Sequence, residues 1–421
     1  MDTPRKVIVG YDLCDDFTRI SCYSYKLNEP IPIGLEEGES EDSQIPTVLC
    51  IKNDTKQWLF GEEAIRGAQN GQGLKAEHLL TKLRNDEVTE LYEVKFTAIS
   101  LMEKFLRKTL TLVKNYFPTE QISKLVITIR DTEPILVDRI YEALALLGIG
   151  KDRAVVISHA GAYLYYALSQ DKSLWMNDVG LFDFNREGLH YYQIRLSRRT
   201  RPVIAILHKA DYTNTLNIDM LKQKDISPSY IFENIAGEVL YKQIITTLYF
   251  TGSGFEGDWA EEVIRGLCTG RRVFYGQNLF TKGACYAARE LSGDKRLTEI
   301  LLLNDDMVRG SVELRVYRDT KFIEVPLVQA GDIWYEVDQS IDVIPEGQAE
   351  LEIIRKDIMT KDVFREKLAL GGFPERPDRS SRLNIHFSCT DKTTGILRVT
   401  DLGFGDFFPA SGEIMEFTLE I

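Results

Sequence analysis

The expected secondary structure changes character once along the chain, near residue 300, and this change limits the folds that the chain can adopt. Before that point, apolar runs of strand length alternate with amphipathic helical stretches. The run 125–129 (Leu-Val-Ile-Thr-Ile) is almost entirely apolar, which is typical of a parallel strand covered on both faces. From residue 311 onward, short alternating runs are separated by Gly, Pro and Asp turns. The sequence therefore predicts an α/β domain followed by an antiparallel β-sandwich, with the boundary near residues 300–310.

The expected elements follow one another at short intervals. Hydrophobic periodicity predicts strands at 7–12, 19–25, 45–51, 57–61, 125–129, 155–158, 179–184, 189–196 and 248–250, and helices at 94–116, 134–147, 160–168, 231–246, 258–267 and 280–291. The first two strands are expected to pair as a hairpin. The acidic stretch 36–42 is expected to be a solvated loop.

Charge and composition exclude several classes of protein. The chain has 64 acidic and 51 basic residues, a net charge of −13, which disfavours binding to nucleic-acid phosphates. It contains no run of about 18 apolar residues, so no membrane span is expected. The start lacks the apolar core of a secretory signal, and the six cysteines form no C-x-x-C pair. These features predict a reduced, cytoplasmic protein without a membrane or nucleic-acid partner.

Three short segments have the residue types of a nucleotide site. An aspartate ends each of two predicted strands, at Asp12 and at Asp183. A glycine-rich loop, 251–257, lies between a strand and a helix and matches G-x-G-x-x-G, the dinucleotide fingerprint. The next strand-like run, 272–276, carries no ribose-binding acid at its end. The alternative interpretation is therefore an actin-like site, in which two strand-end aspartates hold phosphates and Mg²⁺ and the loop holds adenosine.

The order of these segments resembles the DnaK-type heat-shock chaperones of the actin-like ATPase superfamily. The resemblance rests on the segments Ile45-Pro46-Thr47-Val48, Leu59–Ala64, Leu125–Ile129, Leu147-Gly148-Ile149, Leu291–Asp294, Ile300–Asn304, Leu370–Pro374, Leu383–Phe387 and Thr394–Asp401. It implies an α/β actin-like (ribonuclease H-like) two-lobed ATPase fold over residues 1–298, with a shortened second-lobe insertion. A linker-like segment at 299–310 and a substrate-binding-type β-sandwich at 311–421, without a helical lid, would follow.

The same resemblance assigns roles to individual residues. Gly10, Asp12 and Asp183 would hold ATP or ADP with Mg²⁺, the metal lying on the two aspartates. The adenosine loop would be formed by Gly252, Ser253 and Gly254. His159 falls where the family has its catalytic glutamate, and Lys82 is the candidate for the phosphate-contacting lysine.

The two predicted phosphate loops depart from the family pattern at the positions where the family's loops approach the phosphates. Residues 14–16 (Cys-Asp-Asp) replace Gly-Thr-Thr in the first loop, and residues 185–187 (Asn-Arg-Glu) replace three glycines in the second. Glycine lets backbone N–H groups approach phosphate oxygens, and carboxylates there repel a polyphosphate.

The main hypothesis is therefore a chaperone-like pseudo-ATPase that binds a protein or peptide partner, with strand addition at a sandwich edge as one mode of docking. The alternative is a divergent ATPase with weak Mg²⁺-dependent hydrolysis that uses Asp12, Asp183 and His159. A third hypothesis is that the cleft binds a different ligand.

Overall fold

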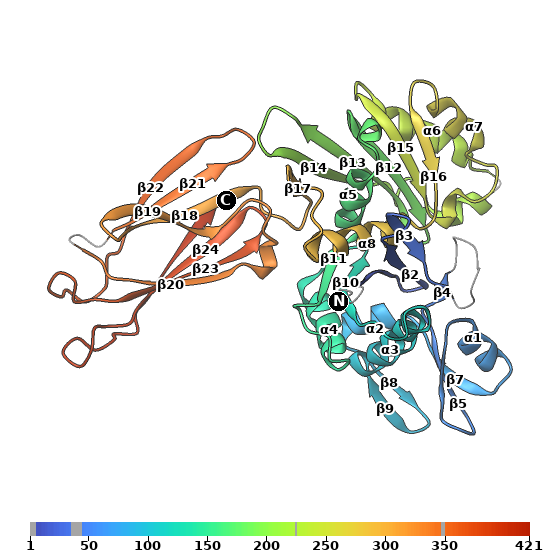
Figure 1. Cartoon of the computed structure of the whole chain (residues 1–421), viewed down its shortest axis with the longest axis horizontal. Coiled ribbons are helices and arrows are strands. Elements are labelled where there is room, and N and C mark those ends of the chain that lie inside the picture. The colour runs from blue at the N-terminus through green and yellow to red at the C-terminus, as the bar shows by residue number, and fades with distance from the viewer. Residues whose placement is uncertain (1–5, 35–43, 224, 347–349) are drawn as a thin grey trace. The chain divides into compact units, whose positions relative to one another are not determined.

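The chain divides into two compact units, residues 1–300 and 301–421 (Figure 1). The computed structural model describes residues 6–34, 44–223, 225–346 and 350–421. The acidic stretch 36–42 lies outside the described residues. The first unit is mixed α/β with several sheets, and the eight α-helices found among the described residues all belong to it.

The first large sheet of unit one has the order β11-β10-β1-β2-β3, with β4 beside β2. Its strands are β1 (Val7–Leu13), β2 (Phe17–Ser24), β3 (Glu29–Pro32), β4 (Ile45–Pro46), β10 (Ile122–Ile129) and β11 (Ala154–Ser158). β1 and β2 are antiparallel, so the predicted hairpin is confirmed. β10 is parallel to both β1 and β11, as its apolar run predicts.

Five strands of the second large sheet repeat this order, as β16-β15-β12-β13-β14. These strands are β12 (Asp178–Asn185), β13 (Gly188–Ser197), β14 (Val203–Asp211), β15 (Ile245–Thr251) and β16 (Arg272–Tyr275). In both sheets three antiparallel strands are followed by two parallel ones, and the first strand lies in the middle. The two halves of unit one therefore share one topology.

Helices connect and cover the two sheets. They are α1 (Gly61–Gln69), α2 (Leu79–Asn85), α3 (Ala98–Tyr116), α4 (Pro134–Ala145), α5 (His159–Ser169), α6 (Pro228–Leu240), α7 (Glu261–Leu267) and α8 (Leu279–Leu291). Smaller sheets are formed by β5 (Leu49–Lys52), β6 (Trp58–Phe60) and β7 (Gly73–Ala76), and by β8 (Val88–Leu91) and β9 (Val94–Thr97). At Gly283 of α8 a Cβ would lie 2.1 Å from the Ala162 carbonyl oxygen, so α8 packs closely on α5.

Two predicted helices differ most from their observed bounds, each for a local reason. The helix predicted at 94–116 begins at Ala98, because 94–97 form β9 and Thr97 Oγ1 accepts the Ser100 N–H at 3.2 Å. The helix predicted at 231–246 spans 228–240 instead. Pro228 at its first turn favours the earlier start, and extended Tyr241 ends it before β15.

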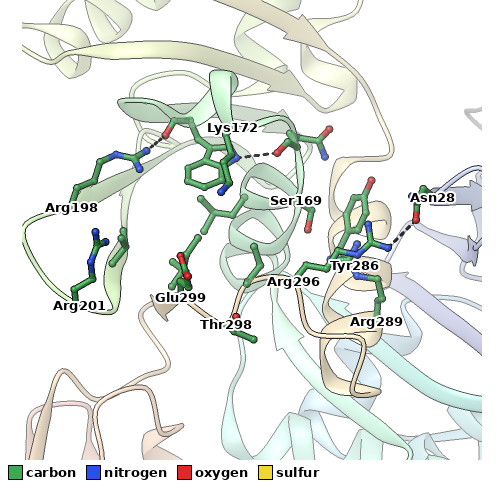
Figure 2. A pocket seen from close by; sticks show the side chains of 16 residues that line it. Asn28, Ser169, Lys172, Arg198, Arg201, Tyr286, Arg289, Arg296, Thr298 and Glu299 are labelled. Atoms are coloured by element: carbon green, nitrogen blue, oxygen red, sulfur yellow. Dashed lines mark hydrogen bonds between the residues drawn. The ribbon is translucent and has the colours of Figure 1, made fainter.

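A cavity of about 510 Å³ opens at one side of unit one (Figure 2). Its walls come from the end of α5, the 3₁₀ helix η1 (Lys172–Trp175), the turn between β13 and β14, and the chain that follows α8. Part of the segment predicted as a linker, residues 300–303, is a strand, β17 (Ile300–Leu303).

The second unit consists of two four-stranded antiparallel sheets, β19-β18-β21-β22 and β20-β23-β24-β25. Its strands are β18 (Gly310–Arg318), β19 (Lys321–Val328), β20 (Asp338–Val343), β21 (Glu350–Asp357), β22 (Val363–Ala369), β23 (Leu383–Asp391), β24 (Thr394–Asp401) and β25 (Ile414–Glu420). One core joins both sheets; it includes Val312, Leu314, Ile353, Ile385, Phe387, Leu397 and Val399. The unit is therefore a β-sandwich. Across the part of the chain that is described, every helix is too short or too polar to cross a membrane.

Candidate functional site

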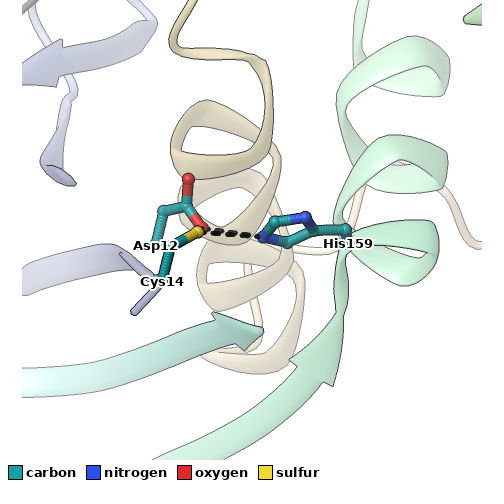
Figure 3. Close-up of side chains that lie close together, drawn as sticks. All are labelled: Asp12, Cys14 and His159. Carbon is teal, nitrogen blue, oxygen red and sulfur yellow. Dashed lines mark hydrogen bonds and ion pairs between the residues drawn. The ribbon is translucent and has the colours of Figure 1, made fainter. Parts of the chain in front are cut away.

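The first strand-end aspartate, Asp12, forms a buried pair with His159 (Figure 3). Asp12 Oδ1 lies 2.8 Å from His159 Nε2, and each side chain is 2% exposed. The imidazole stacks on Phe280, with ring centroids 4.0 Å apart. A buried carboxylate is stable only when it is paired and hydrogen-bonded. His159 supplies that partner from inside the protein.

The sheet itself brings these two residues together. β1, β10 and β11 are neighbouring parallel strands, so their carboxyl ends meet at one edge. Asp12 pairs in register with Thr128 of β10, and His159 directly follows the end of β11. The predicted site residues Asp12 and His159 are therefore in contact.

Cys14 completes a small cluster at this edge. Its Sγ lies 3.6 Å from Asp12 Oδ1 and 4.0 Å from His159 Nε2. Burial, and then the charge of Asp12, raise the pKa of the Cys14 thiol well above its ordinary value, so the thiol stays protonated. A nucleophilic triad needs its acid on Nδ1 and its thiol on Nε2. Here both groups face Nε2, so the cluster is not arranged as such a triad.

The cluster also has the donor atoms of a metal site. One ligand atom from each of Asp12, Cys14 and His159 lies within 4.8 Å of the other two. A set of oxygen, sulfur and nitrogen donors suits zinc, whereas Mg²⁺ prefers oxygen ligands and bound water. The predicted Mg²⁺ on Asp12 and Asp183 stays a prediction.

Asp15, the next residue of the first loop, caps a helix. Its Oδ1 accepts the N–H groups of Leu80 and Thr81 at 3.0 and 3.2 Å, and its Oδ2 accepts the Thr81 hydroxyl at 2.7 Å. These are unpaired donors at the start of α2, where a carboxylate also complements the helix dipole. The carboxylate that replaces a phosphate-loop residue therefore has a structural partner.

The second strand-end aspartate, Asp183, forms an ion pair with Arg130. Asp183 is 1% exposed, and its Oδ2 lies 3.4 Å from Arg130 Nη1. Arg130 directly follows β10 and also pairs, through Nε, with Glu187 of the second loop. Asn185 Nδ2 donates to Asp183 Oδ1 at 3.1 Å. Asn185 and Glu187, two of the three residues that replace the glycines of this loop, thus contact the Asp183–Arg130 pair.

The charged groups around Arg130 shift the pKa values of Arg130 and His190. Burial lowers the pKa of Arg130, but nearby groups, with Asp183 the strongest, raise it by more in sum. Arg130 Nη1 donates to His190 Nδ1 at 3.1 Å. Burial, and then the charge of Arg130, lower the pKa of His190, so this imidazole is neutral near pH 7.

The glycine-rich loop is held by Gln277. The Gly252 N–H donates to Gln277 Oε1 at 3.1 Å, and the Gly252 carbonyl accepts from Gln277 Nε2 at 3.3 Å. A Cβ on Gly252 would lie 2.1 Å from the Phe184 carbonyl oxygen, and one on Gly254 would lie 2.5 Å from the Phe184 ring. Close packing on β12 therefore explains both glycines. Ser253 begins the short 3₁₀ helix η3 (Ser253–Phe255).

Two predicted site residues remain, Gly10 and Lys82, and each contacts a residue other than the strand-end aspartates. A Cβ on Gly10 would lie 2.3 Å from the Cys285 backbone nitrogen, so glycine is needed there for the packing of β1 on α8. Lys82 Nζ lies 3.3 Å from Glu87 Oε2. Neither contact involves a strand-end aspartate.

Sequence reasoning missed Arg130 and Gln277. Arg130 could have been found, because it is a charged residue directly after a buried parallel strand, at the edge where such sheets place their sites. Gln277 carries no signal of this kind, since its contact with Gly252 depends on how the chain returns after β16.

Comparison with known proteins assigns the chain to a family whose function is unknown. Residues 29–305 match the C-terminal part of a family of unknown function, DUF5716. The chain belongs to this family. Residues 307–421 match a domain of unknown function, DUF8552. No curated protein matches the chain.

Proposed function

We propose that this DUF5716 chain is a chaperone-like pseudo-ATPase. In this proposal an actin-like, two-lobed unit has lost ATP hydrolysis, and the β-sandwich binds a protein or peptide partner. The observation that carries the proposal is that both strand-end carboxylates already have partners in the same chain, since Asp12 is hydrogen-bonded to His159 and Asp183 is ion-paired with Arg130.

The repeated topology of unit one supports the actin-like part of the proposal. A fold of two related lobes predicts two sheets of the same strand order. The sheets built on β1 and on β12 have that order, each with its aspartate in the central first strand. The likeness to DnaK-type chaperones is proposed on this basis together with the sequence motifs.

The loss of ATP hydrolysis follows because the polar groups that would bind ATP and Mg²⁺ already have partners within the protein. Phosphoryl transfer depends on positioning and on neutralising phosphate charge. Here the Asp12 carboxylate bonds to His159, the Asp183 carboxylate pairs with Arg130, and the Gly252 N–H donates to Gln277. A magnesium–nucleotide complex would have to break these contacts and would meet Glu187 in the second loop.

A braced aromatic loop supports the partner-binding part. Phe407 is 93% exposed in the loop between β24 and β25. Both ends of that loop are tied to buried Asp401, which accepts from the Gly403 N–H at 3.0 Å and from the Ser411 hydroxyl at 2.7 Å. Arg376 pairs with Asp401 through two contacts of 2.7 Å. An aromatic side chain on a rigid support contacts a partner with little loss of entropy.

An assay of ATP hydrolysis tests the first part. We expect the purified chain with ATP and Mg²⁺ to release no more phosphate than its Asp12→Ala, Asp183→Ala double variant. Turnover that disappears in the double variant would contradict the proposal and favour the divergent ATPase.

Selection of peptides from a displayed library tests the second part. We expect selected peptides to bind the unmodified chain and to lose at least tenfold in affinity, about 1.4 kcal/mol, on Phe407→Ser. Phe322→Ser is the matched control, because Phe322 is also exposed on the sandwich. Equal losses in both variants, or no selected peptide, would contradict partner binding by this loop.

A further inference from the structure

We infer that the cavity of about 510 Å³ in unit one is a binding site for a small molecule that carries two or more negative charges, as phosphate or carboxylate groups. We call it the basic pocket. Its lining includes the cations Lys172, Arg198, Arg201, Arg289 and Arg296. The inference does not depend on the proposed function.

The charge of the pocket is opposite to that of the chain. Among the described residues that line the cavity, five side chains are cationic and one, Glu299, is acidic, whereas the whole chain has a net charge of −13. Glu290 and Asp294, outside the lining, pair with Arg289 and Arg296, so Lys172, Arg198 and Arg201 are the lining cations without an acidic partner among the described residues. Cations that face one another in a concavity raise the local concentration of anions. Surface charge in general does not explain this excess, because acids outnumber bases elsewhere.

Four of the five cations lie in two groups on opposite sides of the pocket (Figure 2). Arg198 and Arg201 come from the turn between β13 and β14, while Arg289 and Arg296 come from α8 and the chain after it. Arginine presents a planar fork of donors that matches phosphate and carboxylate oxygens. Two groups of arginines favour a ligand with an anionic group for each side.

Within the described residues, two buried polar atoms of the pocket lining have no hydrogen-bond partner. They are the Nε of Arg289, a side chain that is 2% exposed, and the hydroxyl of Ser169. Buried polar groups are normally satisfied, so these two atoms point to bound water or a ligand. Lys172 and Arg201 are exposed cations of the same lining, and no ion pair or hydrogen bond joins them to another described residue.

The side of the pocket formed by α8 and the chain after it is held in place by hydrogen bonds and an ion pair. Arg289 Nη2 lies 2.6 Å from the carboxylate of Glu290, and that carboxylate also accepts the backbone N–H groups of Arg296 and Leu297 at 2.8 and 3.1 Å. Arg296 is oriented further by Asn28, whose Oδ1 lies 2.9 Å from its Nη2. The guanidinium groups are therefore positioned before a ligand arrives, which lowers the entropic cost of binding.

The size and the remaining lining fit a metabolite. A volume of about 510 Å³ is in the range of small-molecule sites. Trp175 and Tyr286 add flat apolar surface between the charged groups. The pocket thus combines anion-binding groups with a place for a nonpolar ligand body.

Calorimetric titration of the full chain with inorganic pyrophosphate tests the inference. We expect saturable binding at one site, weakened about tenfold by Arg201→Ala and by Arg296→Ala, one from each side of the pocket. The matched controls are Arg199→Ala and Lys295→Ala. Each removes one exposed positive charge next to a pocket residue without altering the lining.

The pattern across the four variants decides the outcome. Loss in the two lining variants with unchanged affinity in the two controls supports the basic pocket, provided that all four melt at the temperature of the parent. Absence of pyrophosphate binding, or equal weakening in lining and control variants, would overturn the inference.

Discussion

The two large sheets of unit one share a strand order, yet their central aspartates have partners of different kinds. Asp12 is hydrogen-bonded to a histidine that follows β11, a parallel strand of the same sheet that is separated from β1 by β10. Asp183 is paired with an arginine that follows a strand of the other sheet, and this arginine is a permanent cation. Topology therefore determines where a carboxylate lies, and the surrounding side chains determine whether that carboxylate is available to bind a ligand.

The largest expected effect is that of Arg130→Ala. It leaves Asp183 buried without its cation and removes the partner of Glu187. Breaking a buried ion pair from one side destabilises by roughly 3–5 kcal/mol. Urea denaturation measures this loss. Arg186→Ala, in an exposed residue of the same loop, is the control and should change stability by less than about 0.5 kcal/mol. Similar values for both variants would show that Arg130 does not hold the second strand end.

A smaller loss is expected for His159→Ala, at the first strand end. The variant removes the hydrogen bond to Asp12 and the stacking on Phe280, for about 2 kcal/mol in unfolding free energy. A loss larger than that of Arg130→Ala would reverse the ranking of the two sites.

The pH dependence of stability separates the two sites further. The pKa of His190, beside Arg130, is lowered in the fold from its ordinary value of 6.5. Between the lowered pKa and 6.5 the unfolded chain binds more protons than the folded one, so stability falls as pH drops through this window and is complete above it. We expect His190→Gln to lose less stability than the parent on going from about pH 7.5 to about pH 5.5. A parental slope in His190→Gln would rule out this role.

The sequence predicted where the strands lie along the chain better than it predicted which strands pair with one another. The apolar run 125–129 and the hairpin at the start were identifiable because burial on both faces leaves a pattern in the residues. No internal repeat was visible, since strand order depends on pairing and not on residue identity. The β9 strand was missed because its alternation merges with the helix that Thr97 caps.

The candidate site was predicted in part for similar physical reasons. Asp12 and His159 were expected at one site, and they are in contact. Lys82 was placed by resemblance alone, and it pairs with Glu87. The glycines at 252 and 254 suggested a ligand, but a glycine needed for packing leaves the same trace in a sequence as one needed for binding.

A crystal structure of the protein grown with a non-hydrolysable ATP analogue and Mg²⁺ tests the loss of the nucleotide site most directly. We expect the 2.8 Å contact between Asp12 and His159 and the ion pair between Asp183 and Arg130 to remain, with no nucleotide density at the strand ends. Density for a polyphosphate with Mg²⁺ between Asp12 and Asp183, with both pairs broken, would contradict it.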